Sequence, residues 1–128
     1  MNATETAIYA RNDSKKVVND LTNNLMWQDD KTVLKDWQGA IDYCQNLNLG
    51  GYSDWRLPNK EELNTIVDTN NNPSIKKEFK NTASYYYWSS TPYAGISNGA
   101  WVVGFNSGDE GYNSKNDSNS VRCVRNSK

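Results

Sequence analysis

The chain of 128 residues contains only two cysteines, Cys44 and Cys123, which stand far apart in the sequence. Their separation excludes the Cys-x-x-Cys spacing of redox motifs and zinc sites. A disulfide accounts for both residues most economically, and closing so long a loop would stabilise the fold by roughly 4 kcal/mol in the chain-entropy model. Two buried free thiols are the alternative. With a disulfide, we expect a secreted, periplasmic or cell-surface protein.

The chain has no histidine, so it lacks the commonest general base, the Ser-His and Cys-His nucleophile pairs and imidazole metal ligands. Its 14 basic and 15 acidic residues give a net charge of -1, which provides no long-range attraction for a polyanion. We therefore expect no enzymatic activity and no nucleic-acid partner. No stretch of the sequence reaches the roughly 20 apolar residues that span a bilayer, so a membrane-spanning protein is not expected either.

Large aromatic side chains compensate for a low overall hydrophobic content. Hydrophobic residues make up 36% of the chain, but five Trp and eight Tyr supply extensive surfaces for burial. A chain of this length forms one domain, so we expect residues 1–128 to be a single domain with an aromatic-rich core.

Hydrophobic periodicity predicts two helices. Apolar residues at helical spacing from Trp37 to Leu47 indicate the first, with Asp36 as its N-cap and Gly50 as its end. The second should begin after Pro58, because Asn59 and a glutamate three residues later match a capping box.

Several short segments predict strands. Residues 17–18 and 25–27 indicate a hairpin with a turn at Asn23 and Asn24. The aromatic and β-branched segments SYYYWSST, GAWVVGF and SVRCVR indicate three more strands. The polar stretch 106–120 should be an exposed, mobile loop.

The segment DWRLP, which precedes the second helix, contains Trp55, Arg56, Leu57 and Pro58. We interpret it as a structural strand-to-helix corner, because alternate side chains bury and the proline fixes the chain direction. Arg56 could pair with Glu61 or Glu62, or stack on a tryptophan, and would then hold the corner in place. A ligand clamp is the functional alternative.

Two regions offer candidate ligand-binding residues. In a regular SYYYWSST strand, Tyr86 and Trp88 share one face, where exposed rings could stack on sugars. The candidates in the predicted loop are Asp109, Glu110, Tyr112, Asn113 and Asp117. Oxygen ligands of this kind suit calcium, the one cofactor that we consider, although their spacing does not match an EF-hand and a solvated loop is the simpler interpretation.

Two basic clusters could serve an anionic ligand. The first, a predicted basic patch, consists of Lys76, Lys77 and Lys80. The second consists of Arg122, Arg125 and Lys128. Exposed charges of this kind contribute little individually and are screened by salt, so oligomerisation would be needed to raise the avidity.

The blocks DWRLP, YWSST and VRCVR, in this order from about Val17 to Arg125, resemble the bacterial Lcl C-terminal domain family, also called DUF1566. The resemblance implies an α+β, C-type lectin-like fold in which two helices flank a twisted antiparallel sheet. It also implies a distant similarity to formylglycine-generating, sulfatase-modifying enzymes. In C-type lectin-like folds a disulfide ties the first helix to the last strand, and Cys44 and Cys123 occupy these places.

These observations favour a non-catalytic bacterial extracellular or envelope domain that binds a glycan or a cell-surface protein, as an adhesin does. Anionic glycosaminoglycans are a specific version that the resemblance implies. One alternative is a sulfatase-modifying-type oxidase, which needs reactive cysteines. The other is a structural module of a larger envelope protein.

Overall fold

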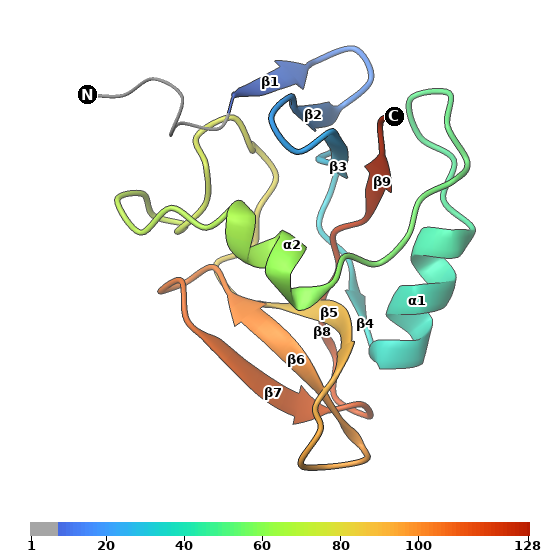
Figure 1. The fold of residues 1–128 in the computed structure, drawn as a ribbon, viewed down its shortest axis with the longest axis vertical. Helices are drawn as coiled ribbons and strands as arrows, with labels where there is room; N and C mark the ends of the chain where they lie inside the picture. Colours follow the sequence, from blue (N-terminus) through green and yellow to red (C-terminus); the bar gives the residue numbers. More distant parts are fainter. Residues whose placement is uncertain (1–7) are drawn as a thin grey trace.

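In the computed structural model, which describes residues 8–128, the chain is mostly β and is organised around two sheets (Figure 1). The four-stranded sheet has the order β1–β2–β3–β9, and the five-stranded sheet has the order β4–β8–β5–β6–β7. The strands of the first sheet are β1 Tyr9–Asn12, β2 Val17–Asp20, β3 Leu25–Gln28 and β9 Val124–Asn126. Those of the second are β4 Leu34–Lys35, β5 Tyr86–Pro92, β6 Gly99–Gly104, β7 Glu110–Ser114 and β8 Asn119–Ser120.

The predicted fold class is wrong. The expected α+β, C-type lectin-like arrangement of two helices flanking a twisted antiparallel sheet is replaced by two sheets and two short helices, α1 Trp37–Gln45 and α2 Lys60–Thr65. The second sheet is mixed, because β5 and β8 pair in parallel. Two of the strands, β7 and β8, lie in the polar stretch 106–120, which lacks an apolar pattern and was expected to be a loop.

The predicted hairpin and both helix starts are confirmed. β2 pairs with β3 through a turn in which Asn24 has φ 56°. Asp36 accepts a hydrogen bond from the Gly39 N–H at the start of α1, but α1 ends at Gln45 rather than near Gly50. Neither helix has the length and apolar composition of a membrane span, a finding that concerns residues 8–128.

The segment SVRCVR does not form one strand. Its first residue belongs to β8 in the second sheet, whereas its last two residues belong to β9 in the first, and the backbone of Val121–Cys123 crosses between the sheets. Val121 and Cys123 are buried in one hydrophobic cluster and Val124 in the other. This crossing connects the two halves of the molecule.

The core consists of two hydrophobic clusters. The first contains Ala40 and Cys44 of α1 together with Trp88 of β5. The second contains Leu63 of α2 and Trp27 of β3. Trp27 and Trp88 are fully buried, so the predicted aromatic-rich core is confirmed.

Candidate functional site

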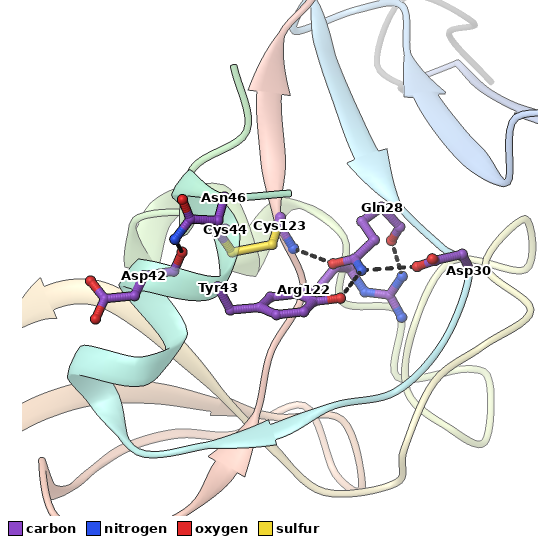
Figure 2. Close-up of a disulfide and its surroundings, with 8 residues drawn as sticks. All are labelled: Gln28, Asp30, Asp42, Tyr43, Cys44, Asn46, Arg122 and Cys123. Atoms are coloured by element: carbon purple, nitrogen blue, oxygen red, sulfur yellow. Dashed lines mark hydrogen bonds between the residues drawn. A yellow bond between two sulfur atoms is a disulfide. The ribbon is translucent and has the colours of Figure 1, made fainter. Parts of the chain in front are cut away.

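The predicted disulfide is confirmed, and neither sulfur is a free thiol. Cys44 of α1 is bonded to Cys123 with a Cα–Cα distance of 5.5 Å (Figure 2). The side chain of Gln28 supports this connection, because its Oε1 accepts the Cys123 N–H and its Nε2 donates to the Tyr43 hydroxyl, each at 3.0 Å. Helix α1 is therefore attached to the crossing segment by a covalent bond and by a buried amide.

Arg122 does not belong to an exposed basic cluster, contrary to the prediction. Its guanidinium is buried, donates to Asp29 Oδ1 at 3.0 Å and lies 4.7 Å from the ring centroid of Phe79. Arg11 contacts the other oxygen of the Asp29 carboxylate. Sequence reasoning missed this buried network because its members are distant in the chain, although the alternation of VRCVR indicates that Arg122 and Cys123 point to opposite sides.

Arg125, the second member of that predicted cluster, is also engaged in an ion pair. Its Nε lies 2.6 Å from Asp54 Oδ1, and its guanidinium lies 3.7 Å from the ring centroid of Tyr52. The hydrogen bond from Arg125 holds the pKa of the Asp54 carboxyl below its usual value. Lys128 is exposed at the end of the chain, so these three cations do not form a common surface.

Arg56 acts within the corner, as the structural interpretation of DWRLP predicted. Two of its nitrogens donate to the two carboxylate oxygens of Glu62 at 2.8 and 2.7 Å. Glu62 also accepts the Asn59 N–H and thereby completes the predicted capping box. Burial raises the pKa of Glu62, but the hydrogen bonds from Arg56 and Asn59 outweigh this effect and lower it overall.

The remaining residues of the motif fix the corner to its neighbours. Trp55 and Leu57 are buried in the first cluster, and the Pro58 carbonyl accepts the Ser90 N–H at 2.7 Å. Arg56 and Val124 exchange backbone hydrogen bonds, which connects the corner to β9. Every part of this motif therefore has a structural role.

The predicted basic patch is only partly accessible. Lys77 and Lys80 are exposed, whereas Lys76 is half-buried with its Nζ 6.0 Å from the ring centroid of Tyr9. The backbone N–H of Lys80 donates to Asp29, so the base of the patch rests on the buried network.

Of the two aromatic candidates in β5, Trp88 was wrongly placed on a ligand-binding face. It is fully buried, and its Nε1 donates to the Lys35 carbonyl at 2.8 Å. Tyr86 is 37% exposed and lies beside Tyr85, with a centroid distance of 5.9 Å. Tyr87, on the opposite face of the strand, is also buried, so β5 is covered on both faces at this point and alternation alone could not locate an exposed face.

The candidates in the stretch 106–120 do not converge. Asp109 accepts a hydrogen bond from Ser107, Asn113 donates to Asn119, and Asp117 lies exposed in a turn. Within residues 8–128, no three Asp, Glu, His or Cys side chains are grouped in a way that could hold a metal ion. Glu110 and Tyr112 instead lie on β7, where Glu110 lies near Lys60 and Tyr112 stacks on Tyr93.

An aromatic platform, consisting of Tyr93, Trp101 and Tyr112, covers the β6–β7 edge of the second sheet. Tyr93 stacks on Tyr112 with a centroid distance of 4.1 Å and lies 4.9 Å from Trp101. Lys60, the first residue of α2, places its Nζ 4.1 Å from the Trp101 ring centroid and 3.8 Å from Glu110. The sequence contains a partial signal for this surface, because Tyr112 and Glu110 are among the predicted ligand-binding residues.

The β4 groove is a separate hollow of about 630 Å³ beside the first strand of the second sheet. Four of the residues that line it carry hydroxyl groups, namely Thr32, Tyr85, Ser118 and Ser120. Apolar side chains line it from Val33, Leu34 and Ala83. Sequence reasoning missed this groove because β4 is too short to show a pattern of its own.

The fold and these two surfaces define a disulfide-linked, mostly β domain that has an open groove beside one sheet. A family model described as the Lcl C-terminal domain matches residues 16–125, and the chain belongs to this family. This finding confirms the resemblance that the three sequence blocks indicated. A search of curated proteins gave no significant match.

Proposed function

We propose that this Lcl C-terminal domain is a non-catalytic extracellular or envelope module that binds an uncharged glycan in the β4 groove. The observation that carries the proposal is the composition of the groove wall. Among residues 8–128, those that line the groove include no acidic or basic side chain, and its volume of about 630 Å³ falls within the range of small-ligand pockets. A ligand that fits there needs no charge.

The mixed lining suits the two-sided character of a sugar ring. Tyr85 and Leu34 remain 49% and 62% exposed, respectively, and they offer apolar surface to the C–H face of a pyranose. The hydroxyls of Thr32 and Ser118 can both donate and accept hydrogen bonds, as sugar hydroxyls require. An anionic glycosaminoglycan is a poorer fit, because no cation lines this part of the described surface.

The chemistry of the groove favours binding over catalysis. Glycoside hydrolysis generally requires a pair of carboxyl groups, and acyl transfer requires a nucleophile with an adjacent base. Ser118 and Ser120 have no such base among the lining residues that the structure describes. The alternative of a sulfatase-modifying-type oxidase requires reactive cysteines, but Cys44 and Cys123 are joined to each other. The disulfide in turn supports an oxidising, extracytoplasmic location.

A glycan array probed with matched tyrosine variants tests the proposal. Wild type should bind neutral glycans, and Tyr85→Ala should weaken binding by about tenfold, because the stacking ring is lost. Tyr86→Ala is the control, because it removes an equivalent exposed ring from the neighbouring residue, which does not line the groove. Absence of neutral-glycan binding, or equal binding by both variants, would contradict the proposal; selective binding of sulfated glycans would point to a different surface.

A further inference from the structure

The aromatic platform lies at the far edge of the second sheet from the β4 groove. The strand order β4–β8–β5–β6–β7 places β4 at one end and β7 at the other. Trp101 of β6 and Tyr112 of β7 are directly opposed in the antiparallel register, and Tyr93 follows the end of β5. A ligand on the platform would therefore contact none of the residues that line the groove.

The platform keeps apolar surface and a hydrogen-bond donor available to solvent. Tyr112 is 44% exposed although it stacks on Tyr93. Trp101 is half-buried, and its indole N–H has no hydrogen-bond partner in the part of the chain that the structure describes. Three other indole N–H groups donate to backbone carbonyls, namely those of Trp37, Trp55 and Trp88. Trp101 thus combines a ring that packs at a tilt against Tyr93 with an indole N–H that has no partner among residues 8–128.

Polar groups of fixed position border these rings. Glu110 accepts a hydrogen bond from the Asn64 amide at 2.8 Å and lies 3.8 Å from Lys60 Nζ. Its side chain remains 40% exposed, so its oxygens can accept further hydrogen bonds from a ligand. Because the charges of Lys60 and Glu110 offset each other, the border favours an uncharged ligand rich in hydroxyl groups.

We infer that the aromatic platform is a second saccharide-binding surface, which takes an uncharged sugar whose ring carbons pack on Tyr112 and whose hydroxyls contact the Trp101 N–H and the Glu110 carboxylate. A purely structural role would explain how the rings pack on one another, but it leaves the exposed Tyr112 surface, and an indole N–H that has no partner within residues 8–128, without a use. The inference does not depend on the groove. Two separate sites on one domain would allow it to engage two sugar chains at once and gain avidity.

Titration followed by ¹H–¹⁵N NMR tests this inference with maltotriose, cellotriose and N,N′-diacetylchitobiose as individual probes. At least one probe should shift the Trp101 indole signal, which is assigned by its loss in Trp101→Phe. Tyr112→Ala should raise the Kd for that probe by about tenfold or more, because the stacking surface is removed. Tyr85→Ala, which alters only the groove, should leave the indole shift unchanged.

The outcomes separate the two surfaces. If no probe shifts the indole signal, or if Tyr112→Ala binds as wild type does, the platform is not a saccharide site. If Tyr112→Ala does not fold, Trp101→Phe provides the test, because it keeps a ring but removes the donor, and β7 backbone amides then report a weaker Kd. A shift that disappears in Tyr85→Ala would show that the sugar binds in the groove and would overturn the second site.

Discussion

The two sides of the crossing segment Val121–Cys123 are held by different kinds of interaction. Cys123 is directed into the first cluster and is bonded covalently to α1, whereas Arg122 is directed towards Phe79 and Tyr87 of the second cluster and is held by Asp29. In the chain-entropy view a disulfide stabilises by restricting the unfolded chain, but an ion network acts only when its partners are assembled. Cys123 thus stabilises the crossing by restricting the unfolded chain, whereas the adjacent Arg122 stabilises it through interactions that exist only in the folded protein.

The donors of the ion network satisfy both oxygens of the Asp29 carboxylate at its centre. Each oxygen of Asp29 has two partners, because the backbone N–H groups of Lys80 and Asn81 donate at 2.8 and 3.0 Å in addition to the contacts from Arg11 and Arg122. Removing one partner from such a buried arrangement leaves an uncompensated charge and unsatisfied donors, which is costly. The network side should therefore be more sensitive to a single substitution than the disulfide side.

The largest effect is expected from Asp29→Asn. This change removes the negative charge between two arginines and should lower the free energy of unfolding by about 3–5 kcal/mol. Urea unfolding under non-reducing conditions measures the change. Asp13→Asn is the control, because Asp13 also contacts Arg11 but its side chain is 77% exposed, and we expect a change of less than about 0.5 kcal/mol. Equal stabilities of the two variants would contradict the importance of the network.

The next largest effect is expected from loss of the disulfide. The double variant Cys44→Ala, Cys123→Ala should lower the free energy of unfolding by about 2–4 kcal/mol while the network keeps the crossing segment in place. Reduced wild type should show a similar loss, so a denaturation curve with and without reductant provides an independent measurement. If reduction leaves the unfolding midpoint unchanged, the covalent side contributes nothing to stability.

A smaller effect is expected at the DWRLP corner, where the Arg56 backbone is hydrogen-bonded to Val124, the residue after the crossing segment. The pKa of Glu62 is lowered in the folded protein, so its contribution to stability is present above the unfolded value of about 4.3 and is lost as the pH falls through the folded value. Glu62→Gln should cost roughly 0.5–1 kcal/mol at neutral pH, since the Arg56 side chain is 40% exposed, and should flatten the acid side of the stability profile.

Glu61→Gln is the matched control for this profile, because the adjacent Glu61 side chain is 75% exposed. Free energies of unfolding measured from neutral pH down to about pH 3 should decline less steeply for Glu62→Gln than for Glu61→Gln. Parallel curves for the two variants would show that the corner pair does not contribute to acid sensitivity.

Features with a local signal were predictable from the sequence, whereas features assembled from distant residues were mostly not; the disulfide is the exception, because the chain contains just two cysteines. The capping box at Asn59, the N-cap at Asp36 and the turn at Asn24 depend on residues within one turn of the chain, and the structure contains all three. The environment of Asp29 depends on segments that meet only in the folded protein, so no spacing rule could reveal it.

The candidate site followed the same division. Glu110 could be selected for its carboxylate and Tyr112 for its ring within the polar stretch 106–120, but their aromatic neighbours come from the β5 end and from β6. Trp88 was selected as a ligand-binding residue but is fully buried, because an alternating pattern cannot show which faces of a strand are covered. Sheet pairing, rather than residue type, decides which ring reaches solvent.

The position of β8 has a consequence for biosynthesis. This strand lies between β4 and β5, and the crossing that follows it delivers both Arg122 and Cys123. Ribosomes make chains from the N-terminus. The second sheet, the disulfide and the Arg122–Asp29 ion pair therefore cannot be completed until residues 119–126 have been synthesised. Assembly of this domain is therefore completed only after residues 119–126 have emerged.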